Sequence, residues 1–276
     1  MTAPRTGTFP NGMDFATWGD GAKTLLFLPG GPGSAVPTGL SSRMSRRWFD
    51  PFVEAGYAVW HVTRRRNMPA GHSVEDMAGD YAQLIADEFS GRVDLVVGES
   101  YGGMIAQYLA ALHGDTWNHL AIVVAAAEVS DWGKEVDSRL CAALAGGDKA
   151  GFGMTFAEYV LPGERSRWAR RLLGPWIAHS LLSEKSYPRS DLLVELEAEI
   201  AYDARPVLPH IEDPVVLLSG DRDQFFPIDV VEETVGLIPD CALVTYDGQG
   251  HVKAATNKRV AHDVLAFIER GQGVVH

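Results

Sequence analysis

The chain has 276 residues, of which 46% are hydrophobic and 22% charged, and its formal net charge is -12 at pH 7. These proportions are those of an ordinary globular protein, long enough for one large α/β domain with an insertion or for two small domains. The negative charge argues against nucleic acid or an anionic membrane surface as a partner, because the long-range field repels phosphates.

The first half of the chain alternates short apolar strands with amphipathic helices. Such strands, apolar on both faces, are typical of a parallel sheet that helices cover on both sides. In chain order we predict edge strands within residues 8–18, a strand over 23–28, a helix over 46–55, a strand over 57–62, a helix over 77–89, a strand from residue 93, a helix over 104–112 and a strand over 120–124. The sequence therefore predicts an α/β fold with a mostly parallel central sheet.

The alternation stops over residues 128–205 and then resumes. The interrupting segment predicts several helices and loops without a strong strand, and it is rich in aromatic residues. We interpret it as an insertion that sits over another part of the molecule. The remaining elements are strands over 214–219 and 242–246 with a short helix between them, and a closing helix over 254–270.

The strand that begins at Val93 ends in a candidate nucleophile. Gly98-Glu99-Ser100-Tyr101-Gly102 fits the pattern G-x-S-x-G, and good helix formers follow it. A strand, a tight turn and a helix are the context in which this pattern marks a nucleophilic serine. The glycines allow the strand and helix backbones to approach each other. Taken alone, the segment could also be a glycine-rich turn with a capping serine.

Two later polar residues lie at comparable places in the chain. Asp223 and His251 each follow a predicted strand, as Ser100 does. The carboxyl ends of parallel strands share one edge of the sheet, where sites form. We therefore predict a catalytic triad in which His251 accepts the Ser100 proton and Asp223 holds the other ring nitrogen. Asp221 and Glu128 are alternative positions for the acid.

A tetrahedral oxyanion requires fixed hydrogen-bond donors. The backbone N–H of Tyr101, at the start of its helix, is one candidate. A second donor is expected in the loop Pro29-Gly30-Gly31-Pro32-Gly33. The two prolines have no N–H, so only the three glycines can donate, and we choose Gly31.

These pieces together resemble the α/β-hydrolase superfamily over nearly the whole chain. Residues 28–33 are similar to the family's HGGPG oxyanion loop, with Pro29 where histidine is usual. The turn at residues 98–103 that carries the serine, called the nucleophile elbow, also matches the family, as does the chain order serine, aspartate, histidine. The resemblance implies that the oxyanion donor falls on Gly31 and the acid on Asp223.

The resemblance also implies a division of the chain. Residues 1–127 and 206–276 would form the α/β-hydrolase core, and residues 128–205 would form a helical cap, or lid, inserted after the sixth strand. Most aromatic side chains of the cap are expected to form its own core. Trp132 and Phe156 are our candidates for substrate contacts.

The triad and the aromatic cap together predict a serine hydrolase of the carboxylesterase or lactonase kind. It would cleave an ester, thioester or lactone bond of a small, largely apolar substrate through an acyl-enzyme on Ser100. Alternatives are a prolyl-aminopeptidase-like hydrolase, which the glycine–proline loop suggests, and a non-hydrolytic lyase, oxygenase or ligand sensor on the same fold. The triad needs no metal or organic cofactor, and no metal or dinucleotide motif is present.

Three consecutive arginines, Arg64, Arg65 and Arg66, follow the 57–62 strand. They could hold a substrate carboxylate, but a solvated charge run is the interpretation that we favour. For His61 and His72, which flank the same loop, we favour a packing or solvent role over a role in the site.

No apolar run approaches the roughly 20 residues of a membrane span, and the N-terminus lacks the apolar region of a signal peptide. We therefore expect a cytoplasmic protein whose partner is a small-molecule substrate, with neither nucleic acid nor membrane. The sequence leaves the oligomeric state open, with a homodimer among the options.

Overall fold

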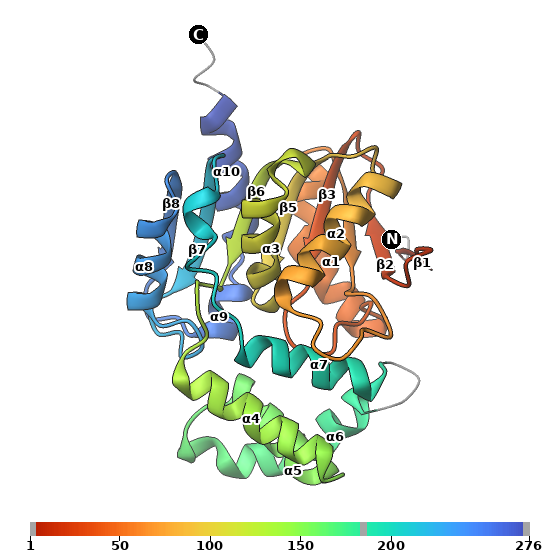
Figure 1. The fold of residues 1–276 in the computed structure, drawn as a ribbon, viewed down its shortest axis with the longest axis vertical. Helices are drawn as coiled ribbons and strands as arrows, with labels where there is room; N and C mark the ends of the chain where they lie inside the picture. The colour runs from red at the N-terminus through yellow and green to blue at the C-terminus, as the bar shows by residue number, and fades with distance from the viewer. Residues whose placement is uncertain (1–3, 183–186, 273–276) are drawn as a thin grey trace.

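The computed structural model describes residues 4–182 and 187–272, and within them an eight-stranded sheet runs through the centre of the molecule (Figure 1). The strand order is β1-β2-β4-β3-β5-β6-β7-β8, with β1 and β2 antiparallel at one edge and the other strands parallel to one another. The strands are β1 (Arg5–Thr8), β2 (Asp14–Trp18), β3 (Lys23–Leu28), β4 (Tyr57–Val62), β5 (Val93–Glu99), β6 (Trp117–Val123), β7 (Val215–Gly220) and β8 (Cys241–Tyr246). The predicted α/β class with a mostly parallel sheet is confirmed.

Helices cover both faces of this sheet. The α-helices of the core are α1 (Gly39–Glu54), α2 (Val74–Glu88), α3 (Tyr101–Leu112), α8 (Ile228–Leu237), α9 (His251–Ala255) and α10 (Val260–Gln272). The core also has the short 3₁₀ helices η1 (Gly114–Thr116) and η3 (Leu208–His210), and a third, η2 (Glu164–Ser166), lies in the segment between β6 and β7. Side chains of α2, α3 and α8 form one apolar cluster with the sheet, and those of α1, α9 and α10 form the other. Alternate residues of a strand face opposite ways, so Leu26 and Leu28 join the first cluster and Leu25 and Phe27 the second.

Four helices between β6 and β7 form the cap: α4 (Asp131–Ala145), α5 (Lys149–Val160), α6 (Arg167–Leu181) and α7 (Arg189–Ile200). They lie together below the sheet in Figure 1, beyond the carboxyl ends of the parallel strands. Their buried apolar side chains, among them Val136, Leu140, Phe152 and Leu196, form a separate cluster. This is the helical cap after the sixth strand that the resemblance implied.

Local sequence signals account for several helix boundaries. The amide of Asp76 donates to Ser73 Oγ over 3.1 Å and the Asp76 carboxylate accepts from the Ser73 amide over 2.9 Å, so these two residues form a capping box at the start of α2. The single closing helix predicted over 254–270 is wrong, because the chain turns between α9 and α10. There the Asn257 side chain accepts a hydrogen bond from the Arg259 amide, a local bond that competes with the helix.

The register of the parallel strands places their carboxyl ends side by side. Leu28 of β3 pairs with Gly98 of β5, and Glu99 pairs with Val123 of β6. The loop after β3 and the turn after β5 therefore leave the sheet at the same edge, which faces the cap.

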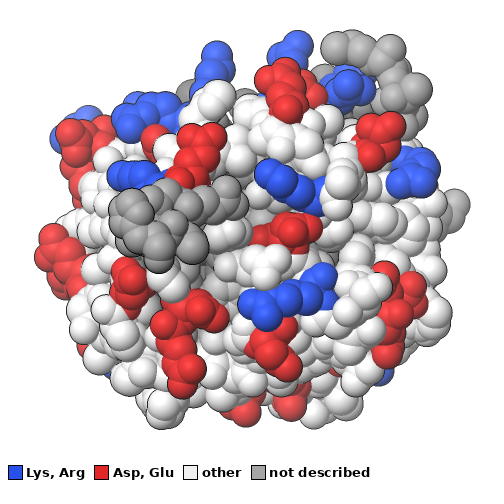
Figure 2. Space-filling view, turned by 90° about the horizontal axis from the view of Figure 1, so that it is seen from above, with Lys and Arg blue, Asp and Glu red and all other residues white. Residues whose placement is uncertain are grey.

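Figure 2 views the molecule from the end opposite the cap. Lysine and arginine side chains are interspersed there with aspartate and glutamate, and neither sign forms a continuous patch on this face. In the part of the chain that the structure describes, no helix is both long enough and apolar enough to cross a membrane.

Candidate active site

Ser100 lies at a sharp turn between β5 and α3. Its φ of 51° and ψ of -113° are unusual for a residue with a side chain, and such a conformation costs about 1–3 kcal/mol. The turn also needs glycine neighbours. A Cβ on Gly98 would lie 2.4 Å from the Gly102 carbonyl oxygen, and one on Gly102 would lie 2.0 Å from that of Leu28. The strain and the close approach together are those of a nucleophile elbow.

Ser100, His251 and Asp223 form a continuous hydrogen-bonded chain. Ser100 Oγ lies 2.9 Å from His251 Nε2, and His251 Nδ1 lies 2.7 Å from Asp223 Oδ2. The Asp223 side chain is fully buried, and its other oxygen accepts the backbone N–H groups of Phe225 at 2.9 Å and Phe226 at 3.2 Å. These bonds hold the carboxylate in place, and it in turn holds the imidazole with Nε2 toward the serine.

The alternative acids lie elsewhere. Asp221 is exposed and accepts a hydrogen bond from the Gln249 amide. Glu128 forms ion pairs with Lys134 at 2.5 Å and Arg205 at 2.7 Å. Neither has a hydrogen bond to the histidine among the described residues, so Asp223 is the acid that the structure places beside it.

The loop after β3 passes directly against the elbow. A Cβ built on Gly30 would lie 3.0 Å from Ser100 Cβ, and Gly31 and Pro32 line the same cavity as Ser100. Tyr101 is the first residue of α3, so its N–H has no acceptor within that helix. The two predicted oxyanion donors, Gly31 and Tyr101, therefore flank the serine, and their role stays a prediction.

Arg64 corrects the interpretation of the arginine run as solvated. Its side chain is 1% exposed and donates to the carbonyl oxygens of Pro29 at 2.9 Å and Gly31 at 2.5 Å and to Glu195 Oε1 at 2.5 Å. Glu195 Oε2 accepts the Gly33 amide over 2.5 Å. This buried ion pair connects cap helix α7 to both ends of the loop that carries Gly31. Sequence alone could not reveal it, because the partners are 131 residues apart.

The other two arginines of the run form partly exposed ion pairs, Arg65 with Asp80 and Arg66 with Asp14. His61 is buried, as expected for a packing role, and burial lowers its pKa to about 4.

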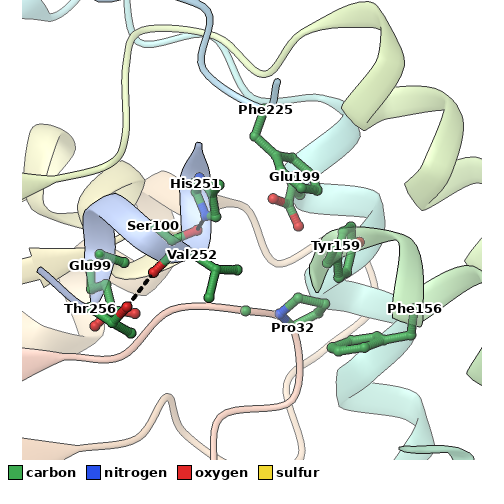
Figure 3. Close-up of a pocket in the computed structure, with 12 residues that line it drawn as sticks. Pro32, Glu99, Ser100, Phe156, Tyr159, Glu199, Phe225, His251, Val252 and Thr256 are labelled. Carbon is green, nitrogen blue, oxygen red and sulfur yellow. Dashed lines mark hydrogen bonds between the residues drawn. The ribbon is translucent and has the colours of Figure 1, made fainter. Parts of the chain in front are cut away.

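A cavity of about 180 Å³ opens beside Ser100 between core and cap (Figure 3). Its lining residues are Gly31, Pro32, Glu99, Ser100, Phe156, Tyr159, Glu199, Phe225, His251, Val252, Ala255 and Thr256. Phe156, one of the two predicted cap residues, is therefore in the wall. Trp132 is not among these lining residues. It packs against Phe225, with ring centroids 4.9 Å apart, and borders a second hollow that His251 also lines.

Sequence reasoning missed three carboxyls in or near this cavity that the fold covers wholly or in part. Burial raises the pKa of Glu99, the residue before the nucleophile, to about 7. In the cap, Glu195 and Glu199 lie four residues apart on α7, a spacing that usually marks the solvated face of a helix. Both are buried. The only sequence signal for this burial is that apolar residues lie on nearly every side of the same helix, which indicates that the helix has little solvated face. Among the described residues, no group of three or more His, Cys, Asp or Glu side chains could hold a metal ion.

A family model described as "Alpha/beta hydrolase family" matches residues 25–263. This range includes the elbow, the oxyanion loop, the cap and all three triad positions. The chain therefore belongs to the alpha/beta hydrolase family.

Among curated proteins, the chain is 26% identical over 207 residues to RutD of Yersinia enterocolitica, a protein named as a carbamate hydrolase, and the match covers 72% of this chain and 70% of that protein. RutD of Stutzerimonas stutzeri is 22% identical over 199 residues, with 72% and 74% covered. Among solved structures, an esterase from Exiguobacterium antarcticum has a TM-score of 0.71 at 19% identity, with 95% and 99% covered. The enol-lactonase from Burkholderia xenovorans has a TM-score of 0.68 at 20% identity, with 93% and 95% covered. At these identities, the likeness to the solved structures is a likeness of fold.

Proposed function

We propose that this hydrolase cleaves an ester, thioester or lactone bond of a small, largely apolar molecule through an acyl-enzyme on Ser100. The observation that carries the proposal is the unbroken chain from Ser100 Oγ through His251 to buried Asp223, beside a cavity with mainly apolar walls. The names of the relatives support it, since they include an esterase, an enol-lactonase and a carbamate hydrolase.

In the first step, His251 Nε2 accepts the Ser100 proton as Oγ attacks the substrate carbonyl. The resulting imidazolium is stabilised by Asp223, and the oxyanion by the N–H groups of Gly31 and Tyr101. His251 then donates its proton to the leaving group, which leaves the acyl group on Ser100. In the second step, His251 takes a proton from water as the water oxygen attacks the acyl carbonyl. His251 then returns this proton to Ser100 Oγ as the bond between Oγ and the acyl carbon breaks and the acid leaves.

The test is covalent labelling combined with turnover. A fluorophosphonate probe should label Ser100, and Ser100→Ala should abolish both the labelling and the hydrolysis of p-nitrophenyl esters while the circular dichroism spectrum stays unchanged. The substrates assayed should also include thioesters, lactones and an aryl carbamate, the last because of the two RutD relatives. Ester turnover that persists in Ser100→Ala would rule the proposal out.

A further inference from the structure

Two buried carboxyls of the cap have hydrogen-bonding capacity that the described chain does not fill. Glu199 on α7 is 5% exposed and lines the cavity, and its Oε2 has no hydrogen-bond partner among the described residues. Asp137 on α4 is fully buried. Its Oδ1 accepts the hydroxyl of Tyr159, and its Oδ2 has no partner. Figure 3 shows the Glu199 carboxylate pointing into the space between His251 and Tyr159.

No described cation lies beside either carboxyl, so burial favours the protonated, neutral form of each. Burial raises the pKa of both groups, and repulsion from Asp137 raises that of Glu199 further. Neither forms an ion pair with a described lysine, arginine or histidine. Arg64, whose charge acts on Glu199, is already bound to Glu195 and to two carbonyl oxygens.

The rest of the cavity indicates which kind of ligand could place a positive charge beside Glu199 and so favour its ionised form. Its other walls include the rings of Phe156, Tyr159 and Phe225, which suit both a hydrocarbon skeleton and a cation. A volume of about 180 Å³ is close to the roughly 150 Å³ of an apolar cavity that holds benzene. The fitting ligand is therefore small, mainly apolar, and positively charged at one end.

We propose that Glu199, with Asp137 behind it, binds a primary or secondary ammonium group of the substrate. The inference rests on the proposed function, because it places the ammonium in the cavity where Ser100 meets the substrate carbonyl. The ammonium N–H groups donate to the Glu199 carboxylate, and the hydrocarbon contacts the aromatic walls. Glu199 determines specificity in this scheme and takes no part in proton transfer to or from the reacting atoms.

Binding is tested with two ligands of the same skeleton, cyclohexylammonium and cyclohexanol. In the wild type, the ammonium should protect Ser100 from the fluorophosphonate probe at a concentration at least about tenfold lower than the alcohol, a difference of about 1.4 kcal/mol. Glu199→Gln and, as a second variant, Asp137→Asn should reduce this difference to less than about threefold. Glu197→Gln is the matched control, because Glu197 is exposed on the same helix and should keep the full difference.

Turnover is tested with L-leucine methyl ester and methyl 4-methylpentanoate, which differ only by the ammonium group. Glu199→Gln should lower the ratio of their kcat/KM values by about tenfold or more, whereas Glu197→Gln should leave the ratio unchanged. Equal protection by the ammonium and the alcohol in the wild type, or an unchanged ratio in Glu199→Gln, overturns the inference.

A third readout separates this inference from the proposed function. The rise in Tm that cyclohexylammonium causes is measured in Ser100→Ala, which needs neither labelling nor turnover. A rise that Glu199→Gln abolishes supports the ammonium site even if Ser100 proves not to be the nucleophile. The absence of any rise refutes the ammonium site even if Ser100 is labelled.

Discussion

Replacing Glu195 by glutamine should weaken both the fold and the oxyanion loop. The carboxylate accepts hydrogen bonds from Arg64 Nε and from the amide of Gly33, each over 2.5 Å, and from the hydroxyl of Tyr187. The substitution keeps the shape of the side chain but leaves the Arg64 guanidinium, 1% exposed, without its counter-charge. One perturbation thus tests the connection between the cap and the loop that carries Gly31.

The magnitude follows from the burial of the pair. Removing one partner of a buried ion pair costs about 3–5 kcal/mol, because the remaining charge stays uncompensated. Glutamine still accepts one hydrogen bond, and Arg64 keeps its bonds to the carbonyls of Pro29 and Gly31, so we expect a loss of about 3 kcal/mol. Loss of an oxyanion donor lowers kcat by about 10²–10³. The loop is loosened here but not removed, so a decrease of about tenfold to a hundredfold is expected.

Urea unfolding followed by circular dichroism measures the first effect, and the kcat for p-nitrophenyl butyrate measures the second. With a denaturant slope of about 3 kcal/mol per molar, the urea midpoint should fall by about 1 M. Glu197→Gln, on the exposed side of the same helix, should change neither quantity. If Glu195→Gln unfolds within about 0.5 kcal/mol of the wild type and keeps its kcat, the pair does not support the loop and our reasoning fails.

Three further predictions concern the predicted triad, the neighbouring Glu99 and the elbow. Asp223→Asn should lower kcat by about 10⁴-fold through the wrong histidine tautomer, and a loss no larger than that of Asp221→Asn in the same ester assay would contradict this. Glu99 has its pKa raised from an ordinary 4.5 to about 7, so the folded state keeps a proton that the unfolded state loses, and the free energy of unfolding falls as the pH rises through this window. In Glu99→Gln, the decrease in Tm between pH 5 and pH 8 should therefore be smaller, and an unchanged decrease would refute the assignment. Gly102→Ala should fail to fold or lose several degrees of Tm, because its Cβ would lie 2.0 Å from a carbonyl oxygen of β3. Gly79→Ala on helix α2, where a Cβ would meet open space, should instead raise the free energy of unfolding by up to about 1 kcal/mol. Similar Tm values for these two variants would contradict the steric argument.

The elbow and the strand ends could be predicted because their signals are local. Gly98, Ser100 and Gly102 show the turn in five consecutive residues, and the apolar runs before Asp223 and His251 mark the strands that carry them. Parallel pairing then brings the ends of such strands to one edge, so the three side chains could be expected to meet before any coordinates were known.

The cap was harder to predict in detail because its packing depends on contacts between distant segments. Trp132 and Phe156 were equivalent as aromatic residues of a helical segment, and only the folded cap separates them, with Phe156 in the wall of the cavity and Trp132 against Phe225. Helix periodicity predicts an apolar face, but it does not say which polar residues the neighbouring helices will cover.

By itself, therefore, the sequence determined the α/β class, the place of the insertion and the positions of Ser100, Asp223 and His251, because each depends on a short pattern and on the geometry of parallel strands. Only the tertiary structure decided which charges are buried. Whether an arginine or a glutamate faces water depends on what packs over it, and for Arg64 the buried partner Glu195 lies 131 residues away in the chain. For this reason, the meeting of Ser100, Asp223 and His251 could be predicted from the sequence, whereas the buried charges around the cavity required the fold.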